Sequence, residues 1–205
     1  SDPQNALIAD NFREPERITA AQADQLFKPR PARKVKKGSH SPLKQSDLLK
    51  GLKVLDMANV AAGPIGGMIL AQYGAEVIKV DPPTYLHPSL VESTSSYSRG
   101  KRSFLADVKT AQGREAFERL VSSADMVIHN ILDDVAQRLG VTHRQLRKIN
   151  PEIVSAQISA YGGTYRGGWE NRQGFDPLLQ GASGLMAQYG TLEQPQWHGQ
   201  VSCGD

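Results

Sequence analysis

From residue 49 onward, short apolar runs alternate with segments of helical pattern, and this alternation constrains the fold more than any other feature. Helix-like segments, several of them closed by glycine or proline, stand between the apolar runs. A β-α-β-α order predicts a doubly wound, largely parallel sheet of the Rossmann-like type, so the predicted fold class is α/β. The predicted strands lie at Lys53–Ala58, Ala75–Val80, Ser103–Val108, Met126–Asn130 and Ile153–Ser159.

The predicted helices follow the strands in the same order. Two of them end at glycines that are suited to cap a helix, Gly74 and Gly140. In the helix predicted at Thr110–Ser122, Phe117, Leu120 and Val121 lie on the side that we expect to be buried. Further helices are predicted at Thr142–Ile149 and over roughly Pro177–Tyr189.

The first 48 residues have a different composition from the rest. Residues 1–50 hold ten Lys and Arg against six Asp and Glu, so the basic excess lies there. A short amphipathic helix is predicted at Ile18–Phe27, and a Pro- and Lys-rich connector follows it. We therefore predict an N-terminal extension with a basic linker (1–48) and an α/β domain (49–205). The linker has no interleaved aromatic residues, so we expect it to be solvated and predict no nucleic-acid partner.

Several classes of protein are disfavoured by the composition. The chain has one cysteine, Cys203, and therefore no internal disulfide. No apolar run approaches the ~18 residues that cross a bilayer, so we predict no membrane association and a cytoplasmic location. The histidines form no pattern with metal-ligand spacing, so no metal site is predicted, and His129 is interpreted as structural.

In an open parallel sheet, ligands bind beyond the carboxyl ends of the strands. Those ends are the loops that begin at Asn59, Asp81, Asn130 and Ala160. The first loop contains A-A-G-P-I-G-G rather than a dinucleotide fingerprint, so it either faces an anion or is a structural turn. The cations of Arg99–Arg102 either hold phosphates or belong to a solvated loop. Spacing alone therefore predicts a ligand-binding domain and no particular reaction.

The order of short segments along the chain is more specific. The segments include Leu52–Asp56, Ala62–Pro64, Gly74–Pro83, Arg99–Ser103, Asp107–Lys109, Ala124–Val127, Arg138–Gly140, Ile158–Gly162, Gly174–Asp176 and Ser183–Met186. About a dozen such segments, in this order, resemble the family III CoA-transferases, the CaiB/BaiF-like enzymes, over residues ~50–205.

The resemblance implies a site and a reaction. Asp205, which follows Gly204, falls at the position of the family's nucleophile. It would accept CoA from an acyl-CoA as an aspartyl intermediate and pass it to a small carboxylic acid. CoA contacts are implied for Asn59, Val60, Ala61, Ala62, Asp81, Pro82, Lys109, Asn130 and Arg138.

The resemblance also implies partners. Family members are interlocked homodimers or fused pseudo-dimers, so we expect a C-terminal half and a second protomer or module to complete the sheet. Residues 1–48 look like the linker of fused two-module members, such as the CoA-transferase-type dimethylsulfoniopropionate lyases.

Two departures from the family pattern bear on the reaction. Phe175 stands where the racemases carry a histidine, and Ala61 stands where the oxalate enzymes carry a glutamine. Both disfavour those activities. A CoA-ester racemase or isomerase and a non-catalytic CoA-binding half remain the alternatives, and Cys203 is the rival nucleophile because a thiolate is intrinsically reactive.

Overall fold

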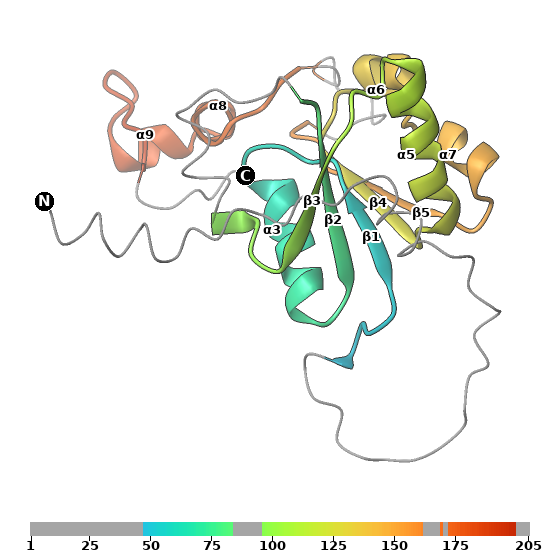
Figure 1. Cartoon of the computed structure of the whole chain (residues 1–205). Helices are drawn as coiled ribbons and strands as arrows, with labels where there is room; N and C mark the ends of the chain where they lie inside the picture. The colour runs from blue at the N-terminus through green and yellow to red at the C-terminus, as the bar shows by residue number, and fades with distance from the viewer. Residues whose placement is uncertain (1–46, 84–95, 162–168, 170–171, 200–205) are drawn as a thin grey trace, which may run out of the picture.

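The computed structural model of the chain describes residues 47–83, 96–161, 169 and 172–199 (Figure 1). The predicted helix at 18–27, the basic linker, Cys203 and Asp205 lie outside these residues. Among the helices of the described part, none is long and apolar enough to cross a membrane.

The described residues form a five-stranded sheet in which every pair of neighbouring strands is parallel. The strand order is β3-β2-β1-β4-β5, so the chain runs outward from the central β1 through β2 to β3. It then crosses back to the other side of β1 and continues outward through β4 to β5. This arrangement confirms the predicted α/β class and the parallel sheet. The strands are β1 (Lys53–Asp56), β2 (Glu76–Asp81), β3 (Lys101–Leu105), β4 (Met126–His129) and β5 (Val154–Gln157).

Helices cover both faces of the sheet (Figure 1). One face packs against α3, where Val54, Val77 and Ile128 form a buried cluster with Leu70 packed against it. The other face packs against α5 and α7 and forms the larger core. The helices are α3 (Ala62–Gln72), α5 (Ala111–Ser123), α6 (Asp133–Leu139), α7 (His143–Ile149), α8 (Asp176–Ala182) and α9 (Leu185–Tyr189).

The predicted buried side of α5 is confirmed, since Phe117, Leu120 and Val121 are each at most 2% exposed. Helix ends follow the expected capping chemistry. Thr142 forms a capping box with Gln145 at the start of α7, and Gly140 closes α6 in the left-handed conformation. Local sequence signals therefore predicted these boundaries well.

Two predicted elements differ from the structure. The single helix predicted at Pro177–Tyr189 is two helices, because Gly184 adopts φ +79° between α8 and α9 and a left-handed residue interrupts the helical hydrogen bonds. The strand predicted at Ser103–Val108 lies earlier, as β3. Residues 107–110 instead form a turn in which Thr110 caps α5 by accepting a hydrogen bond from the backbone N–H of Gly113.

Candidate functional site

A cavity of about 1050 Å³ opens where the strands end. Its walls are the loops that follow all five strands, together with the start of α8. This is the position at which parallel sheets bind ligands, and the volume suits a large ligand. Of the predicted CoA-contacting residues, those that line it are Asn59, Val60, Ala61, Ala62, Asp81, Pro82, Lys109 and Asn130.

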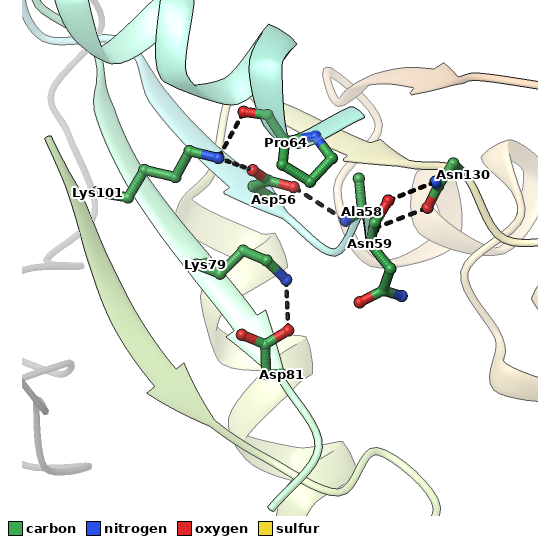
Figure 2. Close-up of polar contacts among 8 residues, drawn as sticks. All are labelled: Asp56, Ala58, Asn59, Pro64, Lys79, Asp81, Lys101 and Asn130. Carbon is green, nitrogen blue, oxygen red and sulfur yellow. Dashed lines mark hydrogen bonds and ion pairs between the residues drawn. The ribbon is translucent and has the colours of Figure 1, made fainter. Parts of the chain in front are cut away.

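The loop between β1 and α3 is held in an unusual conformation. Val60 has φ +68°, a region that β-branched residues rarely adopt and that costs about 1–3 kcal/mol. The Asn130 side chain fixes Asn59, the residue before Val60. Its Oδ1 accepts from the Asn59 N–H at 2.9 Å and its Nδ2 donates to the Asn59 carbonyl at 2.8 Å (Figure 2). Asn130 therefore joins the ends of β1 and β4 and shapes the loop.

A buried ion pair lies beside this loop (Figure 2). Lys101 Nζ lies 2.6 Å from Asp56 Oδ2, and the two side chains are 1% and 0% exposed. The same ammonium donates to the Pro64 carbonyl at 2.7 Å, and Asp56 Oδ1 accepts from the Ala58 N–H at 2.9 Å. Burial lowers the pKa of Lys101, and the Asp56 carboxylate opposes that shift only in part. Lys101 is thus a buried structural cation and does not belong to a solvated basic loop.

Asp81 ends β2 at the wall of the cavity. Its carboxylate forms an ion pair with Lys79, which lies on the same side of the strand (Figure 2). The negative charge that Asp81 brings to the cavity is therefore compensated by a neighbouring cation.

Lys109 follows β3 in a well-defined turn. Its N–H donates to Asp107 Oδ1 at 3.0 Å, and the Thr110 hydroxyl donates to the Asp107 carbonyl at 2.8 Å. The Lys109 side chain itself is exposed and lines the cavity. A rigid turn that carries an exposed ammonium group suits a phosphate contact.

Arg138 is the predicted contact that the structure does not bring to the cavity. It lies on the exposed side of α6, where its Nη1 is 2.9 Å from Asp134 Oδ2. Exposed pairs of this kind contribute little to stability. A contact between Arg138 and CoA stays a prediction.

Some lining residues were missed at the sequence level. Gln157 ends β5, so the rule that identified the other strand ends also applied to it. No local signal marked Arg172 or Leu179, which follow the strands along the chain and reach the cavity only through the tertiary fold. Phe175, which the family comparison had marked only as a departure, also lines the cavity. Arg172 lies over the ring of Trp169, 5.0 Å from its centroid.

His129 is 1% exposed and lies at the end of β4. Its Nδ1 accepts from the Ile131 N–H at 3.3 Å, and burial lowers its pKa. Among the described residues, no group of three or more His, Cys, Asp or Glu side chains is placed to hold a metal ion.

The fold and the cavity together define a Rossmann-like α/β domain with a large cavity at the carboxyl edge of its parallel sheet. The family model for CoA-transferase family III matches residues 49–205. The chain belongs to this family.

Curated relatives and a solved structure show the same likeness. The chain is 37% identical over 163 residues to the CoA-transferase/lyase DddD of a Marinomonas species, covering 76% of this chain and 20% of the relative. It is 37% identical over 155 residues to succinate–glutarate CoA-transferase of Agrobacterium fabrum, covering 68% and 38%. A CaiB/BaiF family protein from Brucella suis superimposes with a TM-score of 0.64 at 35% identity, covering 76% and 44%. The chain spans less than half the length of each.

Proposed function

We propose that this chain forms the CoA-binding part of an enzyme that transfers CoA from an acyl-CoA to a small carboxylic acid. The observation that supports this proposal most strongly is the grouping of eight residues around one cavity. The family resemblance had assigned each of them to CoA from the sequence alone.

The chemistry of the cavity wall fits CoA, a long polyanionic substrate. Lys109 and Arg172 supply cationic groups that can pair with phosphates. The charge of Asp81 is compensated by Lys79, so it opposes an anionic ligand less than a free carboxylate would. We therefore place the phosphates of CoA near Lys109.

Asp205 is the proposed nucleophile. Its carboxylate attacks the thioester carbonyl, which gives a mixed anhydride and CoA thiolate. The thiolate attacks the aspartyl carbonyl, releases the first carboxylate and leaves an aspartyl-CoA thioester. The incoming carboxylate attacks that thioester, which releases CoA thiolate and leaves a second mixed anhydride. The thiolate then attacks the new acyl carbonyl of the anhydride, which forms the product acyl-CoA and regenerates the Asp205 carboxylate. Backbone N–H groups of the β1–α3 loop are suited to stabilise the oxyanions.

A narrower form of this function couples the transfer to cleavage of dimethylsulfoniopropionate. The similarity to a relative named as both transferase and lyase supports this form. So does the extension at 1–48, which resembles the linker of fused two-module members.

We also propose that the active protein is an interlocked homodimer or a fused pseudo-dimer that includes a C-terminal half. Large apolar side chains on α8, α9 and the segment after them support this, since such groups on a surface mark places where further protein packs. The most exposed are Leu178, Tyr189, Leu192 and Trp197.

Trapping the intermediate tests the proposed reaction. The full-length protein is incubated with an acyl-CoA, and the peptide that contains Asp205 is weighed by mass spectrometry. We expect a mass increase equal to CoA joined with loss of water. A racemase or a non-catalytic CoA-binding protein gives no such adduct.

Two substitutions identify the nucleophile. Asp205→Asn should lower the transfer rate by more than about 10³-fold and leave CoA binding largely intact. Cys203→Ala is the matched control and should keep most of the activity. An inactive Cys203→Ala variant beside a normally active Asp205→Asn variant would show that the assignment is wrong.

A further inference from the structure

One ammonium group connects three elements next to the cavity. Lys101, the first residue of β3, reaches Asp56 at the end of β1 and the Pro64 carbonyl in the first turn of α3 (Figure 2). Helix α3 approaches the pair so closely that a Cβ on Gly67 would lie 2.4 Å from Asp56 Oδ2. The ion pair is therefore enclosed between the sheet and the helix.

Stability alone does not explain why a charged pair occupies this place. Removing two charges from water costs more than their attraction commonly returns, and apolar residues of similar volume are often as stable. The direction of the Lys101 pKa agrees, because desolvation outweighs the attraction of Asp56. What an apolar pair would not supply is directed hydrogen bonds, which here lead to Ala58 and Pro64.

Those two hydrogen bonds bracket the β1–α3 loop. Asp56 holds the N–H of Ala58 just before the loop, and Lys101 holds the Pro64 carbonyl just after it. Between them, Asn130 fixes Asn59, and Val60 keeps its strained φ of +68°. A strained residue persists only where its surroundings over-determine the backbone.

We propose that Lys101 is a positioning residue, which acts through Asp56 and Pro64 to hold the loop Asn59–Ala62 in the conformation that receives acyl-CoA. This inference rests on the proposed function, because the loop is the one to which we assign CoA. Lys101 does not itself line the cavity.

Two double variants of the full-length protein test the inference. Asp56→Leu with Lys101→Met replaces the pair by apolar groups of similar shape and removes both hydrogen bonds. Asp56→Asn with Lys101→Met also removes the charges but keeps an oxygen that can accept from the Ala58 N–H. The single variant Lys101→Met should be the least stable of the three, because it leaves Asp56 buried without a counter-ion.

The readouts separate positioning from stability. In the D56L/K101M variant we expect a melting temperature close to that of the wild type. The amides of Ala58–Ala62 should exchange at least about tenfold faster, those of β4 should be unchanged, and kcat/KM should fall at least about tenfold. The D56N/K101M variant should recover part of the exchange protection and part of the kcat/KM.

A D56L/K101M variant with wild-type stability, loop exchange and kcat/KM would overturn the inference, because the pair would then only fill space. If the D56L/K101M variant does not fold, the D56N/K101M variant decides, and wild-type exchange and kcat/KM in it would overturn the inference equally. A wild-type protein that transfers no CoA would contradict the proposed function alone, since loop exchange is measured without turnover.

Discussion

The two walls of the cavity, the sheet and α8, differ in the kind of side chain that they bury. On the sheet side, apolar side chains are buried in two clusters, and the buried charges of Asp56 and Lys101 are paired. In α8 the buried residues are polar, Asp176 and Gln180, and Leu178 is 52% exposed. The usual pattern of an amphipathic helix is therefore inverted in α8.

The contacts of α8 show what its polar side holds. Asp176 Oδ2 accepts from Gln180 Nε2 at 2.7 Å and from Trp197 Nε1 at 2.9 Å. Gln180 pairs with the backbone of His198, accepting from its N–H at 3.0 Å and donating to its carbonyl at 3.2 Å. These hydrogen bonds fix the segment that leads toward Asp205 in the sequence.

The sheet side packs its apolar side chains into buried clusters, although Ile69, Leu105 and Val154 are exposed at its surface. In α8 the inward contacts are polar, and α8 and α9 expose Leu178 and Tyr189. An inverted helix of this kind is stable when further protein covers its apolar side. This difference agrees with the dimer or pseudo-dimer that we propose. It also predicts that substitutions will be tolerated differently on the two sides.

Among the substitutions that compare the two walls, the largest effect on stability is expected from Gly67→Ala in α3. The new Cβ would lie 2.4 Å from Asp56 Oδ2 and 3.1 Å from Lys101 Nζ, so helix and sheet would have to separate. We expect a loss of about 2–3 kcal/mol in the free energy of unfolding, measured with urea.

Two other glycines are the matched controls. A Cβ added at Gly66 would meet no atom of the described residues within 4 Å, and one added at Gly181 in α8 would lie 3.8 Å from Met186 Sδ. Alanine at either position should stabilise the protein by about 0.5–1 kcal/mol, because it favours the helix. Equal stability of the Gly67→Ala and Gly181→Ala variants would show that α3 is not packed more closely against its surroundings than α8.

The next largest effect is expected from Asp176→Ala. This change removes the acceptor for Gln180 and Trp197 and leaves buried donors unpaired, which should cost about 2 kcal/mol. Asp176→Asn keeps one acceptor oxygen and should cost less. If both variants lose the same stability, the hydrogen bonds of α8 are not what holds the 197–198 segment.

CoA affinity measured by calorimetry should distinguish the cations around the cavity. Lys109→Ala should weaken CoA binding about tenfold, equivalent to ~1.4 kcal/mol, through loss of a charged phosphate contact. The family resemblance predicts a similar loss for Arg138→Ala. Asp134→Ala is the control, because it removes only the partner of Arg138. Unchanged affinity in Arg138→Ala would limit this arginine to its exposed ion pair.

The smallest expected effect is a pH dependence of the free energy of unfolding that arises from His129 at the end of β4. Burial lowers the pKa of His129 below the ordinary 6.5, so below pH 6.5 the unfolded chain takes up a proton that the folded protein does not. The free energy of unfolding should therefore fall as the pH drops from 7 to 5.5. His129→Gln should flatten this part of the pH profile, and an identical slope in the variant would assign the effect to other groups.

The fold class, most element boundaries and the edge of the sheet at which the cavity opens could all be predicted from the amino-acid order. Apolar runs set the strands, and local capping groups such as Thr142 and Gly140 set helix ends. The strand-end rule with the family resemblance identified Asn59, Asp81 and Lys109 as lining residues. Strand runs and helix caps depend on residues that are close together along the chain, so the amino-acid sequence shows them directly.

Other features came from tertiary packing alone. The basic run that contains Lys101 suggested either phosphate binding or a solvated loop, whereas its partner Asp56 lies 45 residues away. The break between α8 and α9 depends on the left-handed backbone of Gly184, and the polar burial of Asp176 depends on Trp197. Such contacts form between residues that are distant along the chain, and their burial is set by what packs over them, so no local pattern contains them.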